Sequence, residues 1–101
     1  MEFIDTHTHF YLEHFDSDRE EVMNDCLQSG VRKMFLPNID SHSLKSMLEI
    51  CKQYPSHCYP MLGLHPSDVK ENYQEELDAI LQQFDKHTFI AIGEVGMDLY
   101  W

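Results

Sequence analysis

Short apolar runs alternate along the chain with longer amphipathic stretches. The apolar runs have the length of β-strands, and the stretches between them show the i, i+3, i+4 spacing of helices. The predicted strands are residues 2–6, 31–36, 59–64 and 89–93. The last run is nearly all apolar, so we expect it to be buried on both faces. No linker, low-complexity segment or internal repeat interrupts the pattern, which predicts one domain over residues 1–101.

Three helices are predicted between these strands. The first opens at a capping box, Ser17 to Glu20, and stops at Gly30. The second spans residues 41–53 and the third spans about residues 73–84. Their apolar faces consist of Val22, Met23, Cys26 and Leu27, then Leu44, Met47, Leu48 and Cys51, then Tyr73, Leu77, Ile80, Leu81 and Phe84.

Four strands alternating with three helices predict right-handed βαβ units and a parallel sheet. Two architectures fit: a small open α/β sheet, or the first half of a (β/α)₈ barrel. A complete barrel takes about 250 residues, so this chain would supply the N-terminal half. Residues 97–101 follow the last strand without a further helix, which we interpret as truncation. The first and fourth strands are then expected at the edges of the sheet.

Composition is that of a globular domain, with 43% hydrophobic residues among 101. No apolar run is long enough to span a membrane, and the acidic N-terminus is not a signal peptide. The cysteines are Cys26, Cys51 and Cys58, an odd number without a Cys-x-x-Cys pair. They argue against a disulfide framework or a zinc knuckle, and the cytoplasm is the expected compartment. Cys26 and Cys51 fall at apolar helical positions, which predicts that both are buried.

The formal net charge is −11, from 18 acidic and 7 basic residues. A protein that binds nucleic acid without sequence preference normally presents a basic face. The longest basic cluster here is the pair Arg32 and Lys33. The charge counts against a nuclease, unless bound metal supplies the positive field near a phosphodiester.

Polar residues follow three of the predicted strands. His7 and His9 follow the first strand, His65 the third and Glu94 the fourth. Strand carboxyl ends form the functional rim of parallel α/β folds, and residues i and i+2 point the same way. A metal site with His7, His9 and Glu94 as ligands is one interpretation, with Asp5 accepting an imidazole N–H.

Each of these residues also has a structural alternative. A His-x-His pair is a weak signal alone, His65 before a proline can simply end a strand, and Glu94 can be a solvated loop acid. Glycines on both sides of Glu94 favour a close backbone approach at a crowded site. The other histidines lie in polar surroundings, and we interpret them as surface residues: His14, His42, His57 and His87.

Three segments together resemble one family. Residues 3–9 (FIDTHTH), 63–66 (GLHP) and 93–98 (GEVGMD) have the order and spacing of the TatD-type metal-dependent deoxyribonucleases. The wider amidohydrolase-like group shares the opening His-x-His, but the third segment is typical of the TatD branch. The resemblance covers the whole chain.

The resemblance implies a TIM barrel, (β/α)₈, with one or two divalent cations at its mouth. His7 and His9 would be metal ligands, and Glu94 a catalytic carboxylate ligand that can bridge two ions. His65 would face the scissile phosphate as a catalytic and substrate-binding residue, with Asp98 and Tyr100 lining the same rim. The implied substrate is DNA. Ligand chemistry leaves Mg²⁺, Mn²⁺, Zn²⁺ and Ni²⁺ open.

The chain departs from the family in one large respect. Family members carry two further histidines and a late aspartate on strands beyond residue 101, so the 101 residues hold about half of a site. The parent protein is expected to be a nuclease, or alternatively a related hydrolase of C–N or ester bonds. The 101-residue piece is expected to be inactive alone, and either to self-associate or to pair with the remaining barrel half.

Overall fold

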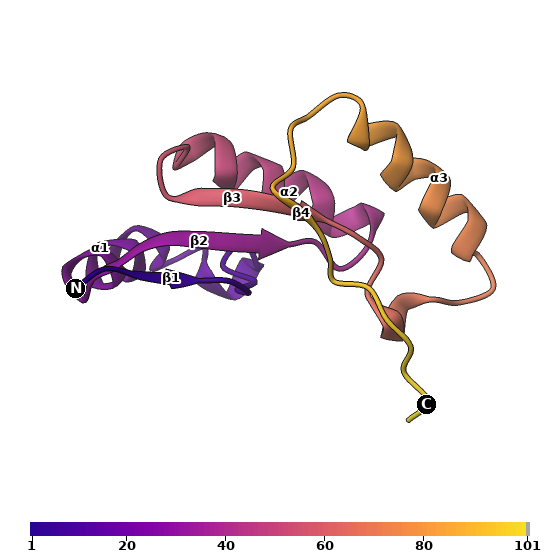
Figure 1. Cartoon of the computed structure of the whole chain (residues 1–101), viewed down its shortest axis with the longest axis horizontal. Coiled ribbons are helices and arrows are strands. Elements are labelled where there is room, and N and C mark those ends of the chain that lie inside the picture. Colours follow the sequence, from indigo (N-terminus) through magenta and orange to yellow (C-terminus); the bar gives the residue numbers. More distant parts are fainter. Residues whose placement is uncertain (101) are drawn as a thin grey trace.

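The computed structural model describes residues 1–100 as one curved parallel sheet with helices between successive strands (Figure 1). The strands run in the order β1-β2-β3-β4, and each neighbouring pair is parallel. Strand order, parallel pairing and the two edge strands are as predicted. The elements are β1 (Phe3–Asp5), η1 (Glu13–Phe15), α1 (Arg19–Gln28), β2 (Val31–Pro37), α2 (Ser41–Gln53), β3 (Cys58–Leu62), η2 (Pro66–Asp68), α3 (Tyr73–Phe84) and β4 (Ala91–Ile92).

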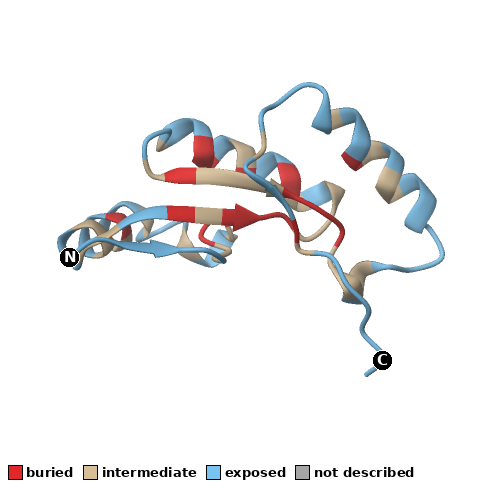
Figure 2. Ribbon diagram, in the orientation of Figure 1, coloured by how far each residue is buried: buried red, intermediate tan, exposed pale blue. Residues whose placement is uncertain are grey.

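The core lies between the central strands and the helices. Met34 and Leu36 of β2 alternate with outward residues and are almost fully buried, at 2% and 0% exposed. They share one cluster with Met23 of α1 and Met47 of α2. On the opposite face of the sheet, Phe35 of β2 contacts Tyr59 of β3 edge-to-face. The two faces therefore differ: helices cover one, while the other is only half-buried (Figure 2).

The predicted capping box at Ser17 is wrong. Helix α1 begins at Arg19, and its N-cap Asp18 makes no side-chain hydrogen bond to the helix. Arg19 fixes this end instead, because its guanidinium donates to the backbone carbonyls of residues 10, 11 and 12. The capping box of this chain is at α2, where Asp40 accepts from the Ser43 N–H and Ser43 Oγ accepts from the Asp40 N–H.

The prediction that the fourth strand is buried on both faces is also wrong. Strand β4 has only two residues, and Ile90 and Ile92 are 46% and 60% exposed. The physical reason is its position at the edge of the sheet, where only β3 pairs with it. The opposite edge behaves alike, since Ile4 of β1 is 53% exposed.

Among the cysteines, Cys51 is buried as predicted, whereas Cys26 is only half-buried, so that prediction is wrong for Cys26. Cys58 is also buried. Within residues 1–100, no helix is both long and apolar enough to cross a membrane.

Candidate metal centre

Three strands deliver polar side chains to one rim of the sheet. After β1 ends, the Thr8 N–H donates to the Phe35 carbonyl of β2 at 3.0 Å, so the segment holding His7 and His9 continues along the sheet. After β3 ends, the His65 N–H donates to the Ile39 carbonyl at 2.8 Å. After β4 ends, the chain passes directly into Glu94. The carboxyl ends of parallel strands therefore bring these side chains together, as the sequence predicts.

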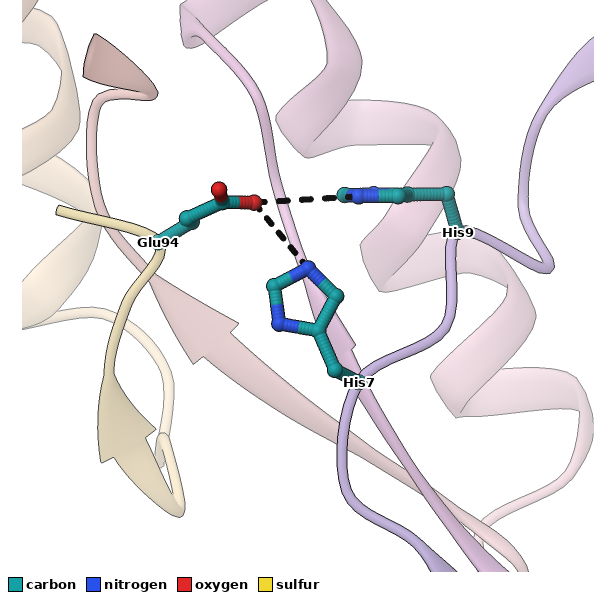
Figure 3. A group of neighbouring side chains, drawn as sticks. All are labelled: His7, His9 and Glu94. Carbon is teal, nitrogen blue, oxygen red and sulfur yellow. Dashed lines mark ion pairs between the residues drawn. The ribbon is translucent and has the colours of Figure 1, made fainter. Parts of the chain in front are cut away.

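The Glu94 carboxylate is the centre of this group. Its Oε2 lies 3.0 Å from His7 Nε2 and 3.9 Å from His9 Nε2. Its Oε1 lies 3.0 Å from His65 Nε2. Figure 3 shows His7 and His9 directed at Glu94 from the segment that follows β1. The four side chains are 25–46% exposed, so the group faces solvent.

The donor set fits a divalent cation. One ligand atom each from His7, His9 and Glu94 lies within 4.8 Å of the others. Two ligands of one tetrahedral ion, each about 2.0–2.2 Å from it, lie about 3.3–3.6 Å apart. The widest pair would therefore have to close by no more than about 1.5 Å. Two imidazoles with a carboxylate are ligands suited to Zn²⁺, Mn²⁺ and Ni²⁺.

Close backbone packing sets the position of Glu94. The Gly93 N–H donates to the Leu62 carbonyl at 2.8 Å. A Cβ on Gly63 would lie 2.7 Å from the Glu94 carbonyl oxygen, closer than real side chains approach. Gly63 is thus required because the segment after β4 passes directly against it.

Asn38 holds Gly63 in place through two hydrogen bonds, a role that was not predicted. Its side chain is fully buried, with Nδ2 donating to the carbonyls of Gly63 and Asp40 at 2.9 and 3.0 Å. Its Oδ1 accepts from the Gly63 N–H at 2.8 Å. One amide therefore ties the end of β2 to the end of β3. A polar residue after Pro37, next to an apolar strand, is the only signal that could have indicated this.

Tyr11 contacts His9 at Nδ1, and this role of Tyr11 was not predicted from the sequence. The Tyr11 hydroxyl donates to the Pro37 carbonyl at 2.6 Å and lies 3.0 Å from His9 Nδ1. Burial lowers the pKa of His9 below its usual value, and the neighbouring His7 lowers it further. Burial also raises the pKa of Tyr11 to about 12. At neutral pH, His9 therefore keeps a lone pair for a metal, and Tyr11 keeps its proton.

His65 pairs with Ser67 through Nδ1, while its Nε2 faces Glu94. The Ser67 N–H donates to His65 Nδ1 at 3.1 Å, and Ser67 Oγ lies 2.8 Å from the same nitrogen.

Asp5 Oδ1 accepts from the His7 backbone N–H at 3.1 Å. The expectation that Asp5 accepts an imidazole N–H is therefore wrong, because the carboxylate is used by the turn after β1.

Asp98 and Tyr100 lie in the segment that leads away from the sheet (Figure 1). Asp98 Oδ1 accepts from the Tyr100 N–H at 2.9 Å, and the Tyr100 side chain is 83% exposed. Among residues 1–100, the group of metal-ligand atoms does not include Asp98. Their role in substrate binding stays a prediction. Trp101, which ends the segment, lies outside the described residues.

The remaining histidines lie apart from this group. His14, His42 and His87 are exposed, as predicted. His57 is half-buried, and its Nδ1 pairs with the Arg32 carbonyl at 2.8 Å. It ties the start of β3 to β2, at the end of the sheet opposite to the candidate site.

The fold and the site define an α/β protein with a candidate divalent-metal centre at the carboxyl rim of a parallel sheet. More narrowly, the chain belongs to the TatD related DNase family, whose model matches residues 4–101. It is 31% identical over 100 residues to the uncharacterized metal-dependent hydrolase YjjV of Escherichia coli K12, covering 97% of this chain and 38% of that relative. It is 32% identical over 84 residues to the 3′-5′ ssDNA/RNA exonuclease TatD of Salmonella typhimurium LT2, covering 83% and 32%.

The structural comparison confirms the fold. The crystal structure of E. coli YjjV, a TatD homologue, superposes with a TM-score of 0.87 at 31% identity, covering 98% of this chain and 39% of YjjV. The four parallel strands and three helices are the N-terminal part of a TatD-type (β/α)₈ barrel, as expected. The chain spans less than two fifths of the length of these relatives.

Proposed function

We propose that residues 1–101 form the N-terminal metal half-site of a metal-dependent hydrolase that cleaves phosphodiester bonds in DNA. The observation that carries this proposal is the convergence of His7, His9 and Glu94, whose ligand atoms lie within 4.8 Å of one another. Their position at the mouth of a barrel fold is where enzymes of this architecture place catalytic groups. The relative named as an ssDNA/RNA exonuclease supports a nucleic-acid substrate.

In this proposal, His7, His9 and Glu94 hold one or two divalent cations. When bound, a cation supplies Lewis-acid polarisation of a phosphoryl oxygen and a water of lowered pKa. His65 Nε2 lies 3.0 Å from Glu94 Oε1, where it orients the carboxylate and is proposed to meet an anionic oxygen of the substrate. Asp98 and Tyr100 are proposed to contact the substrate further along the rim.

The charge of the chain supports a role for bound cations. A net charge of −11 repels a polyanion, and positive ions at the rim would reverse that field locally. The same charge is the one observation that favours the second candidate, hydrolysis of an uncharged C–N or ester bond. Cytoplasmic location remains an expectation.

A chimera tests the proposal, with residues 1–101 joined to the remaining C-terminal part of E. coli YjjV. With Mg²⁺, Mn²⁺, Zn²⁺ or Ni²⁺, the chimera should degrade single-stranded DNA, while the 101-residue chain alone should show little turnover. Glu94→Gln should lower the rate by about 100-fold or more, because outer-shell partners of metal ligands alone are worth about 10- to 100-fold. His87→Ala, which changes an exposed histidine away from the site, should leave the rate unchanged.

Circular dichroism would first establish that the chimera folds. A folded chimera without metal-dependent DNA cleavage would contradict the proposal, as would full activity in Glu94→Gln. Cleavage of an amide or ester by the same folded chimera, with no action on DNA, would favour the second candidate.

A further inference from the structure

We propose that Tyr11 and Ser67 hold His9 and His65 in opposite tautomers. His9 then presents an unprotonated Nε2 to the candidate metal centre, and His65 presents an Nε2–H. Tyr11 becomes a positioning residue that acts through His9. The purpose of this arrangement rests on the proposed function, but the tautomers themselves follow from hydrogen bonds that involve no metal.

The tautomer of His9 follows from counting protons. Tyr11 Oη and the Pro37 carbonyl oxygen are 2.6 Å apart, a separation that requires a proton between them. The carbonyl has none, so the Tyr11 hydroxyl proton points at Pro37. His9 Nδ1 lies 3.0 Å from the hydroxyl oxygen and 3.2 Å from the carbonyl oxygen, and only acceptor positions remain on both. Nδ1 must therefore be the donor, which leaves the lone pair on Nε2.

The tautomer of His65 follows from a backbone donor. The Ser67 N–H donates to His65 Nδ1 at 3.1 Å, and an amide nitrogen cannot accept in return. Nδ1 therefore carries the lone pair, and the ring proton sits on Nε2. That nitrogen lies 3.0 Å from Glu94 Oε1, where the N–H donates to the carboxylate. His65 consequently faces the site as a hydrogen-bond donor.

The opposite tautomers give the His9 and His65 rings different roles beside the Glu94 carboxylate. His65 holds Glu94 Oε1 through its N–H, which leaves Oε2 directed toward His7 and His9. His9 offers a lone pair, as a metal ligand must. His65 offers a proton, as a hydrogen bond to Glu94 or to an anionic substrate oxygen requires. The site is thus built with a ligand side and a donor side.

Tyr11, which contacts the His9 ring, is itself held firmly in the fold. Tyr11 is only 3% exposed. The Arg19 guanidinium donates to the carbonyls of Phe10, Tyr11 and Leu12, the nearest at 2.8 Å. These bonds hold the backbone of the segment, and the buried Tyr11 side chain is held by its own hydrogen bond to the Pro37 carbonyl.

The tautomers can be read by long-range ¹H–¹⁵N NMR of the histidine rings in the metal-free 101-residue chain. At about pH 8, imidazoles are neutral, and the ¹⁵N shifts separate protonated from unprotonated ring nitrogens. His9 should show the Nδ1–H form, whereas His65 and the solvated ring of His42 should show the usual preference for Nε2–H. An Nε2–H form at His9, or an Nδ1–H form at His65, would overturn the inference without any variant.

Tyr11→Phe tests whether Tyr11 is the cause. It should move His9 toward a mixture of tautomers and weaken Zn²⁺ binding by about 10- to 100-fold, the usual effect of losing an outer-shell partner. Tyr59→Phe is the matched control, because the Tyr59 hydroxyl bonds the exposed Ser56 carbonyl instead. Unchanged Zn²⁺ affinity in Tyr11→Phe would overturn the role assigned to Tyr11. A wild-type chain that binds no Zn²⁺ would instead contradict the proposed function, and the metal-free tautomers would still decide the inference.

Discussion

Glu94 is the residue that all three imidazoles of the site contact. Its two carboxylate oxygens meet imidazoles that reach the rim from two different strands, His7 and His9 after β1 and His65 after β3. Three imidazole rings therefore surround one half-buried carboxylate, more than a single hydrogen-bonded pair would require. The arrangement is that of a site organised around a positive charge, which the proposed cation would supply.

Asn38 should be the residue whose loss is most costly outside the apolar core. Asn38→Ala leaves the buried N–H and carbonyl of Gly63 without their partner. The expected loss in free energy of unfolding is about 2–4 kcal/mol. Urea denaturation at fixed chain concentration measures it. Asn24→Ala, on the exposed face of α1, is the control and should change stability by less than about 0.5 kcal/mol. Equal effects of the two substitutions would contradict this account.

The sequence indicated the residues at the strand ends but not those that support them. His7, His9 and Glu94 could be predicted because a residue after a parallel strand lies on a known rim. Tyr11 and Asn38 could not, because the backbone groups that orient them, the carbonyls of Pro37 and Gly63, lie 26 and 25 residues away in the chain. Long-range hydrogen bonds of this kind leave no local periodicity. The turn role of Asp5 was missed for a related reason, since the backbone competes with side chains for a carboxylate.

Among the elements, helix α2 was predicted closely and strand β4 was not. The predicted stripe of α2 is Leu44, Met47, Leu48 and Cys51. All of these are buried except Leu48, which is half-buried and packs against the core. Its apolar face meets β3, so pattern and packing agree. Strand β4 has a fully apolar pattern, yet only one of its edges is paired. An apolar pattern indicates which residues can be buried. Whether they are buried depends on a neighbouring strand or helix that covers them, and β4 has a strand on one edge only.

The contact between α2 and β3 makes stability sensitive to alkali. Burial raises the pKa of Cys51 and of Cys58 to about 12 from an ordinary value of 9.0. Between these values the unfolded chain releases thiol protons that the folded chain retains, so stability is full below pH 9 and falls as pH rises toward 12. The loss is up to about 1.4 kcal/mol per thiol for each pH unit. Tyr11, raised to about 12 from 10.0, adds to the loss above pH 10.

Urea midpoints measured with reductant from about pH 7 to pH 10.5 check this expectation. The double variant Cys51→Ala, Cys58→Ala should show a clearly shallower decline, even if it starts from a lower midpoint. A wild-type midpoint that stays flat over this range would contradict the assignment of both thiols to the core.

At the scale of the whole molecule, the curved sheet exposes apolar surface at both edges. Phe3 and Ile4 on β1 are 50% and 53% exposed, and Ile92 on β4 is 60% exposed. Beside β4, Leu81 and Phe84 of α3 are 60% and 48% exposed and line an apolar groove with Ile92. Surfaces of this kind usually mark an interface. We therefore expect the 101-residue chain to bury these edges against other protein.

Light scattering should accordingly give a mass above that of one 12.0 kDa chain. The net charge of −11 opposes association, and salt screens it within about 10 Å at 0.1 M, so the mass should rise with salt. Ile92→Lys places a charge on the open strand edge and should reduce association. Met97→Lys makes the same change in charge on the exposed segment beyond the strand and should reduce it less. A one-chain mass at every concentration, with cooperative unfolding independent of concentration, would refute this expectation.

The central claim is that His7, His9 and Glu94 together bind a divalent cation, and an NMR titration of the 101-residue chain with Co²⁺ tests it most directly. Paramagnetic broadening reports even weak binding, which matters because the chain spans less than two fifths of its relatives. We expect the His7 and His9 rings and the backbone around Glu94 to broaden first and together. The exposed His42 and His87 should broaden only at higher Co²⁺, and Glu94→Gln should abolish the difference. Broadening that begins at His42 or His87, or that spreads equally over all histidines, would contradict the claim.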